Sequence, residues 1–125
     1  MKFTQEINPD SYYINAHDDA SVSINGEVYQ QSLIILPDEI IANWGVTNIE
    51  QLSLDALGKI QTSDVDVILL STGLLHRIPD MKIMAHYLEQ GIGCEVMSTA
   101  AACRTFNLLV SEGRRVAACL MIETA

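Results

Sequence analysis

Two short runs of small polar residues stand directly after two segments of strand length, residues 65–70 and 92–97. Ligands of open α/β sheets bind beyond the carboxyl ends of the strands, so these runs lie where a site is expected. Hydroxyl groups and the free N–H groups at a helix start can bind an anion, which an arginine would complete. The predicted small-molecule or anion site consists of Ser71, Thr72, Gly73, Ser98, Thr99 and Arg104.

The same residues have structural interpretations that the sequence leaves open. Ser98 and Thr99 precede a predicted helix and are first of all candidates for its N-cap. Arg104 could form an ion pair with Glu95, which would hold strand and helix together instead of binding a ligand. Residues 71–73 also suit a turn that leaves the sheet, because the glycine permits a tight turn.

Other common chemistries have no motif in this chain. The glycine patterns of dinucleotide and phosphate loops and the nucleophile motif G-x-S-x-G are all missing. Three cysteines occur without a C-x-x-C pair, and no two of the histidines have metal-ligand spacing. We therefore predict no catalytic residue, no metal and no cofactor, and binding is favoured over enzyme activity. The histidines are His17, His76 and His86.

The charge is unevenly distributed along the chain, which carries a net charge of -9. Residues 1–75 contain eleven acidic and two basic residues, whereas residues 76–125 contain five of each. Nucleic acids and anionic membranes need cationic patches, so neither is an expected partner. The acidic half could simply keep the protein soluble, or it could serve as a docking surface for a basic protein. Without a signal peptide or an apolar run of about 20 residues, a cytoplasmic protein with no transmembrane segment is expected.

The carboxy-terminal half has the pattern of a βαβαβ unit. Residues 65–70 form an apolar run of strand length, and residues 92–97 and 116–122 are predicted to be the second and third strands. Pro79 and Gly91 bracket one helix between them, and Ser98 and Gly113 bracket the next. Parallel strands need crossover connections, usually helices, so this half is predicted to be an α/β layer.

The amino-terminal part is predicted to be rich in β structure. Asn25-Gly26 indicates a type I′ hairpin turn between two alternating segments. Residues 38–47 fit either a helical turn or an edge strand, and residues 48–60 are predicted as a short helix. We expect residues 1–125 to form a single domain. The predicted strands are residues 12–16, 22–24, 28–31 and 32–36.

Apolar periodicity assigns a core face to each carboxy-terminal helix. The cysteines are predicted to be buried and inert, because free cysteine usually packs as a small hydrophobic residue. The first helix is expected to bury Met81, Met84, Ala85 and Leu88, the second Ala102, Phe106, Leu109 and Val110, and the cysteines are Cys94, Cys103 and Cys119.

The carboxy-terminal motifs carry a resemblance to a known family. They run from a turn of the Gly-Thr-Gly type through Glu-x-Met-x-Thr and Arg-Thr-Phe-Asn to Glu-Gly-Arg before an apolar last strand. In this chain they are Ser71-Thr72-Gly73, Glu95-Val96-Met97-Ser98-Thr99, Arg104-Thr105-Phe106-Asn107 and Glu112-Gly113-Arg114. The chain thereby resembles the Mth-type domain-of-unknown-function family, which includes the mitochondrial complex I assembly factor 3.

The resemblance implies a three-layer α/β fold with a mixed sheet and additional β structure. It also implies a non-catalytic protein-binding or assembly factor linked to respiratory complex I biogenesis, with a protein partner. A small-molecule or anion-binding protein, or an enzyme using the loops named above, is the alternative. Self-association through a sheet edge or the methionine-bearing helix is a third interpretation. Ser71 departs from the family pattern, because it replaces a glycine and would crowd a ligand close to the backbone.

Overall fold

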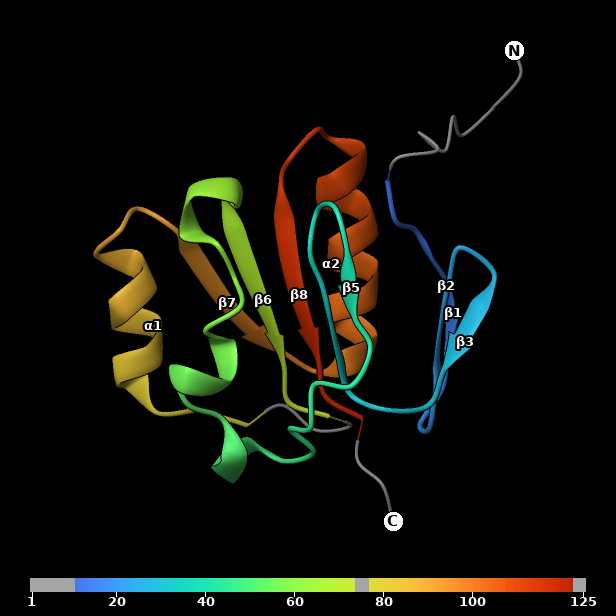
Figure 1. Ribbon diagram of the computed structural model, residues 1–125, viewed down its shortest axis with the longest axis horizontal. Helices are drawn as coiled ribbons and strands as arrows, with labels where there is room; N and C mark the ends of the chain where they lie inside the picture. The colour runs from blue at the N-terminus through green and yellow to red at the C-terminus, as the bar shows by residue number, and fades with distance from the viewer. Residues whose placement is uncertain (1–10, 74–76, 123–125) are drawn as a thin grey trace.

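Two apolar runs, residues 67–70 and 116–120, form the central strands of a mixed five-stranded sheet (Figure 1). The computed structural model describes residues 11–73 and 77–122. Every residue of the two central strands is buried, as expected where both faces of a sheet are covered. The strand order is β5-β4-β8-β6-β7. The strands are β4 (Leu33–Ile35), β5 (Ile40–Ile41), β6 (Val67–Ser71), β7 (Gly93–Met97) and β8 (Val116–Leu120).

The predicted βαβαβ unit is confirmed. β6, β7 and β8 are parallel and are connected by α1 (Met81–Leu88) and α2 (Thr99–Ser111). The first connection moves from β6 to its neighbour β7, and the second returns past β6 to β8. Because such crossovers are right-handed and these two run in opposite directions, α1 and α2 cover opposite faces of the sheet (Figure 1).

The amino-terminal part supplies two antiparallel strands and a separate small sheet. β4 pairs with β8, and β5 lies at the edge beside β4, so residues 38–47 contain an edge strand. The small sheet has the order β1-β2-β3. Asn25 and Gly26 have φ angles of 50° and 86°, which confirms the predicted turn of the type I′ class. The small sheet consists of β1 (Ile14–His17), β2 (Val22–Ile24) and β3 (Glu27–Tyr29).

Alternation along the central strands divides the apolar residues into two cores. Ile68 and Leu70 face the side covered by α1 and by the segment that precedes β6. Val67 and Leu69 face the other side, where α2 and the small sheet pack. The result is a three-layer α/β fold with a mixed sheet, as expected. That residues 1–125 form a single domain stays a prediction.

The predicted helix at residues 48–60 is wrong. This segment makes separate 3₁₀ turns at Ile49–Gln51 and Asp55–Leu57, and a third turn follows it at Thr62–Asp64. Its side chains bond the local backbone and so compete with a continuous helix. The Asn48 side chain accepts from the N–H groups of Glu50 and Gln51, and Ser53 Oγ accepts from Ala56.

The predicted core face of α1 is also wrong. The helix buries Ile83 and Tyr87, whereas Met81 and Leu88 are 64% and 70% exposed. The apolar stripe with the clearest periodicity therefore faces solvent. In α2 the prediction is confirmed: Ala102 and Phe106 are buried, and Leu109 and Val110 pack against the same core.

One amide side chain fixes the small sheet to α2. Asn107 Oδ1 accepts from the Ile14 N–H at 2.9 Å, and its Nδ2 donates to the Ile14 carbonyl at 2.8 Å. These bonds satisfy both backbone groups of Ile14 at the irregularity in the pairing of β1 with β2. Asn107 belongs to the Arg-Thr-Phe-Asn motif, but the sequence did not indicate that it would contact Ile14.

We predict that Asn107→Ala lowers the free energy of unfolding by about 1–3 kcal/mol, because it removes the side-chain partners of two part-buried backbone groups. Urea denaturation gives the magnitude, and amide hydrogen exchange should show faster exchange in residues 14–29. Ser111→Ala on the same helix is the control, since Ser111 is exposed and its side chain bonds the Leu108 carbonyl one helical turn earlier. Equal effects of the two substitutions would contradict the prediction.

Candidate functional site

The structure brings the two predicted loops together at the carboxyl ends of β6 and β7. The Thr99 N–H donates to the Gly73 carbonyl at 2.8 Å, and the Thr72 N–H donates to the Met97 carbonyl at 2.9 Å. Gly73 has a φ of 86°, which favours glycine at this turn. Residues 74–76 of the first loop, which include His76, lie outside the described residues. Backbone bonds therefore link the loops where a crevice was expected.

Ser71, Thr99 and the backbone of Met121 form a closed hydrogen-bond cycle. Ser71 Oγ accepts from the Met121 N–H at 2.9 Å and lies 2.8 Å from Thr99 Oγ1. Thr99 Oγ1 donates to the Met121 carbonyl at 3.2 Å. Because Thr99 has a single hydroxyl proton, Ser71 must be the donor in the bond between the two hydroxyls. Both side chains are buried, so the cycle connects β6, α2 and the residue after β8.

Thr72 and Ser98 are also engaged in local structure. Thr72 Oγ1 donates to the Met97 carbonyl at 3.4 Å and accepts from the Arg77 N–H at 3.1 Å. Ser98 is the N-cap of α2, and its Oγ accepts from the Ala101 N–H at 3.3 Å. The hydroxyls of the predicted site therefore all have internal partners. None of these contacts is to a side-chain base, which an activated nucleophile would require.

Arg104 stands apart from this cluster. Arg104 and Glu95 are both exposed, and the described part of the chain shows no ion pair between them. Exposed pairs add little stability, so there is little driving force to hold these two side chains together. The structure thus groups five of the six predicted ligand residues and leaves the arginine outside their hydrogen-bond network.

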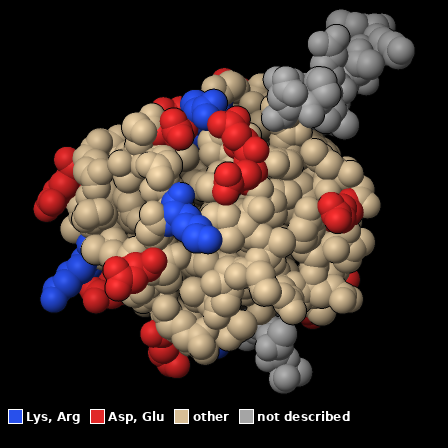
Figure 2. Space-filling view, in the orientation of Figure 1, with Lys and Arg blue, Asp and Glu red and all other residues tan. Residues whose placement is uncertain are grey.

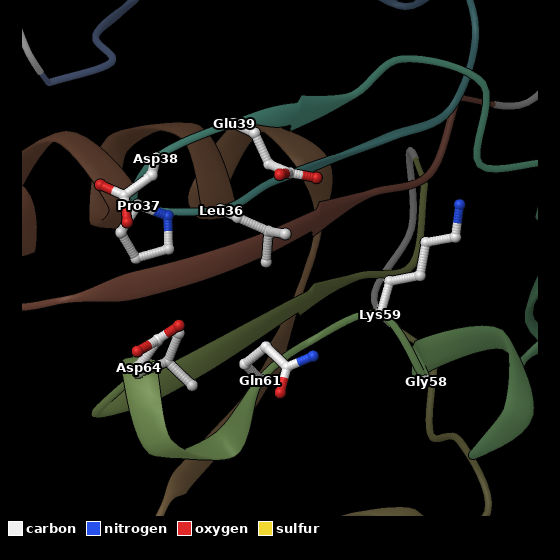
Figure 3. Close-up of a pocket in the computed structure, with 9 residues that line it drawn as sticks. Leu36, Pro37, Asp38, Glu39, Gly58, Lys59, Gln61 and Asp64 are labelled. Atoms are coloured by element: carbon white, nitrogen blue, oxygen red, sulfur yellow. The ribbon is translucent and has the colours of Figure 1, made fainter.

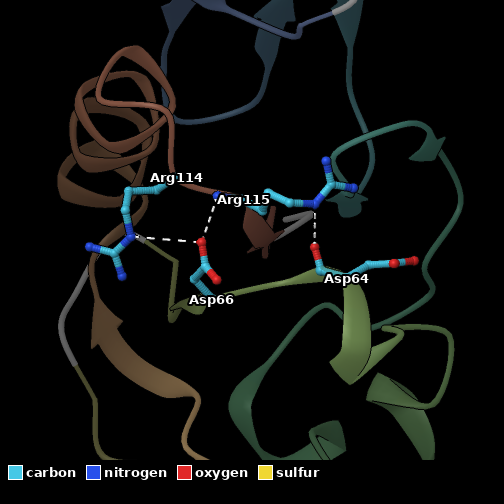
Figure 4. Close-up of polar contacts among 4 residues, drawn as sticks. All are labelled: Asp64, Asp66, Arg114 and Arg115. Atoms are coloured by element: carbon cyan, nitrogen blue, oxygen red, sulfur yellow. Dashed lines mark hydrogen bonds and ion pairs between the residues drawn. The ribbon is translucent and has the colours of Figure 1, made fainter.

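A second polar cluster lies at the opposite, amino-terminal end of β6 and β8 (Figure 4). The Arg115 N–H donates to Asp66 Oδ2 at 3.1 Å, and Arg115 Nε donates to the Asp64 carbonyl at 2.7 Å. Arg114 Nε lies 3.8 Å from Asp66 Oδ2, and Arg115 Nη2 lies 3.3 Å from Asp38 Oδ2. Arg115 therefore connects three segments that are far apart in sequence.

A pocket of about 400 Å³ lies beside this cluster, between the β4–β5 turn and the segment before β6 (Figure 3). Asp38 and Asp64, two of its lining residues, are bonded by Arg115. The sequence did not indicate this pocket, because its polar groups come from separate segments without a motif. The lining residues are Leu36, Pro37, Asp38, Glu39, Gly58, Lys59, Gln61, Asp64 and Val65.

The cysteines pack as apolar residues. Cys103 and Cys119 are buried and Cys94 is half-buried. Burial raises the pKa of Cys94 and of Cys103 to about 11, and it raises the pKa of Cys119 still further. Among the residues that the structure describes, no group of three or more metal-ligating side chains occurs. No helix in that part of the chain is long and apolar enough to span a membrane.

We predict that Ser71→Ala and Thr99→Val each lower the free energy of unfolding by about 1–3 kcal/mol, because each leaves a buried polar group without a partner. The double variant should lose less than the sum, because both changes break one cycle. Urea denaturation measures all three values. Thr99→Ser keeps the hydroxyl and should lose less, and Ser63→Ala, at an exposed serine, is the control. Strictly additive losses would argue against the cycle.

We predict that the native thiols react slowly with a disulfide reagent at pH 8, and that denaturant makes all of them react quickly. The thiolate is the reactive species, and the raised pKa values keep it scarce in the folded state.

The pKa shifts also predict the direction of a stability change with pH. An unfolded thiol ionises near pH 8.5, whereas Cys94 and Cys103 retain their protons to about pH 11 when folded. The folded state then binds more protons, so the free energy of unfolding falls as pH rises across this interval. Cys103→Ala should reduce the slope, measured by urea denaturation at several pH values. An unchanged dependence of the free energy of unfolding on pH would contradict the raised pKa of Cys103. Fast reaction of the folded protein with the disulfide reagent would contradict the raised pKa values of the thiols.

Several named proteins are similar to this chain. The Xenopus tropicalis protein named NADH dehydrogenase (ubiquinone) 1 alpha subcomplex assembly factor 3 is 29% identical over 111 residues. The match covers 87% of this chain but 60% of the relative, so the chain spans little more than half of that protein. A Francisella tularensis protein named 13 kDa major membrane protein is 27% identical over 95 residues, covering 75% of this chain and 76% of the relative.

Solved structures have the same fold. A Xanthomonas campestris protein is 38% identical with a TM-score of 0.80, and the match covers 98% of this chain and 92% of that one. A structure described as an outer membrane protein from Bartonella henselae is 25% identical with a TM-score of 0.81, covering 93% and 98% of the two chains. A Bordetella pertussis protein described as a Mth938-like domain, at 22% identity and a TM-score of 0.81, shows the fold alone.

These similarities confirm the resemblance to the Mth-type family that includes complex I assembly factor 3. The family model described as "Protein of unknown function (DUF498/DUF598)" matches residues 14–121, which is most of the chain. Its matched segment begins in β1 and ends just after β8, so it includes both sheets and both helices. The chain therefore belongs to the DUF498/DUF598 family.

Proposed function

We propose that this protein is a non-catalytic protein-binding factor that assists the assembly of an NADH dehydrogenase complex. The observation that carries the proposal is the similarity to proteins named as NADH dehydrogenase assembly factor 3, which extends over 87% of this chain for the Xenopus tropicalis relative. Because the chain spans only 60% of that relative, the assembly role is transferred as a proposal for this domain.

The geometry of the predicted site supports binding to a protein over catalysis. Ser71 and Thr99 are committed to Met121, and the Ser98 hydroxyl caps α2. A substrate at these hydroxyls would have to break bonds that the fold uses. The pocket of about 400 Å³ beside Lys59 is the specific observation in favour of the alternative function as a small-molecule binder.

The distribution of charge supports a basic protein partner. Acidic side chains are widespread on the face drawn in Figure 2, and residues 1–75 carry most of the acidic residues of the chain. Two of the few arginines, Arg114 and Arg115, are paired with Asp66 and Asp38. Complementary charge mainly raises the rate at which two proteins associate and determines which partner is selected. Salt screens this attraction and so weakens binding.

We predict that the tagged protein recovers a specific partner from its own host, and that deletion of its gene lowers the amount of assembled NADH dehydrogenase complex. Affinity capture at low and high salt, followed by native electrophoresis of membranes, measures both effects. Glu50→Gln/Asp55→Asn should weaken capture at low salt, because it removes two exposed charges from the acidic half. Glu95→Gln/Glu112→Gln makes the same change in charge in the neutral half and is the control.

Normal levels of the complex in the deletion strain, with no partner recovered, would contradict the proposal. A rise in thermal stability with a small metabolite, abolished by Lys59→Met, would then favour the pocket. Equal weakening by the two charge variants would retain a protein partner but contradict its docking on the acidic half.

A further inference from the structure

Helix α1 presents a second apolar stripe that the fold does not cover. Ile83 and Tyr87 fill the core, and the stripe lies along another face of the helix. Met81, Ala85 and Leu88 have the spacing that aligns side chains on one helix face, and all are exposed. Ile78, just before the helix, is 76% exposed. Half of the exposed large hydrophobic residues in the described chain belong to this segment; the six are Val28, Leu54, Ile78, Met81, Leu88 and Leu108.

Two opposite charges lie beside the stripe, placed so that each could pair with the other charge in a second copy of the helix. Lys82 and Glu89 are seven residues apart, or about two helical turns, so they lie on the same flank with one near each end. Neither side chain takes part in an ion pair among the residues described. Ala85, the smallest residue of the stripe, lies midway between Met81 and Leu88 and would permit close approach of another helix.

We propose that the protein forms a two-fold symmetric dimer in which α1 packs antiparallel against α1 of a second copy. A two-fold interface brings the same patch of both subunits together, so each contact occurs twice. In the antiparallel arrangement Lys82 of each copy faces Glu89 of the other, and the two Ala85 residues meet near the axis. Met81 of one copy then packs beside Leu88 of the other. The dimer does not depend on the proposed assembly role.

The charge distribution of the whole chain favours this face for self-association. Residues 76–125, which include α1, carry equal numbers of acidic and basic residues, whereas residues 1–75 carry the net negative charge. The free edge of β7 is the competing place for a symmetric contact. There, antiparallel pairing about the middle of the strand would set Glu95 opposite its own copy, and like charges placed opposite each other are destabilising.

The interface is small, so the dimer should be weak. A helix of eight residues is about 12 Å long, and contacts through one such helix bury less than a standard stable interface. We expect reversible dimerisation with a dissociation constant in the micromolar to submillimolar range. Sedimentation equilibrium across about 10 μM to 1 mM of the full chain should show the mean mass rising toward that of a dimer.

Charge exchange gives the decisive test of the antiparallel arrangement. Lys82→Glu and Glu89→Lys should each weaken the dimer by about tenfold or more, because both ends then carry like charges. An equimolar mixture of the two variants should restore association, since at both ends a glutamate of one chain would then face a lysine of the other. The double variant should restore it as well. Recovery in both cases separates the proposed pairing from a general effect of charge on solubility.

Substitution of the stripe tests the surface independently. Leu88→Ser should weaken the dimer, whereas Leu108→Ser, which changes a comparably exposed leucine on α2, should not. Ala85→Cys should cross-link under mild oxidation, with Val28→Cys on β3 as the matched control. Circular dichroism checks that each variant is folded.

Three results would overturn the proposal. The first is a wild-type chain that stays monomeric up to 1 mM, even if a different protein is then found to bind through Leu88. The second is a dimer that is equally strong in Leu88→Ser and Leu108→Ser. The third is a pair of single charge variants that fail to associate when mixed although each is folded.

Discussion

The central strand β8 can end inside the molecule because two serine side chains take up the N–H groups of the residues that follow it. Met121 donates to Ser71 Oγ and Ile122 donates to Ser32 Oγ, at 2.9 and 2.8 Å. Each buried N–H left without a partner would cost about 1–3 kcal/mol, a large share of the 5–15 kcal/mol that stabilises an ordinary domain. Thr99 closes the same network from the first turn of α2. These hydroxyls thereby connect β6, the end of β8 and the first turn of α2.

Hydrogen bonds of the same region also hold the loops after β6 and β7 together. In open sheets of this kind the loops after neighbouring strands separate and leave room for a ligand. Here the Thr99 N–H and the Thr72 N–H bond across the gap, and the Ser71 hydroxyl lies among backbone groups. Serine in place of the family's glycine supplies an oxygen that a glycine could not. A pocket with room for a small molecule lies at the other end of the strands, where Arg115 braces the turns that line it.

The sequence correctly predicted the elements that are specified by neighbouring residues along the chain. β8 and the first four residues of β6 are apolar runs, and Ser98 and Asn25-Gly26 are local signals with a direct physical cause. Residues 48–60 were mispredicted because the side chains of Asn48 and Ser53 bond the local backbone and the segment forms two short turns instead of one helix. The face of α1 was mispredicted because periodicity locates an apolar stripe without specifying what covers it. The loops of the candidate site were brought together as expected, but their internal bonds depend on Met121, which is distant in sequence.

The positions of the two surfaces argue that self-association and partner binding can coexist. α1 covers the sheet near its β7 edge, whereas the small sheet β1–β3 packs with α2 on the opposite face (Figure 1). A dimer through α1 therefore leaves the small sheet and the β5 edge free. Its contacts join the neutral half of one chain to the neutral half of another, so the repulsion between acidic halves is reduced by distance and salt. Each dimer would then present two acidic halves, and a partner with two binding sites would be held more tightly than either contact alone allows.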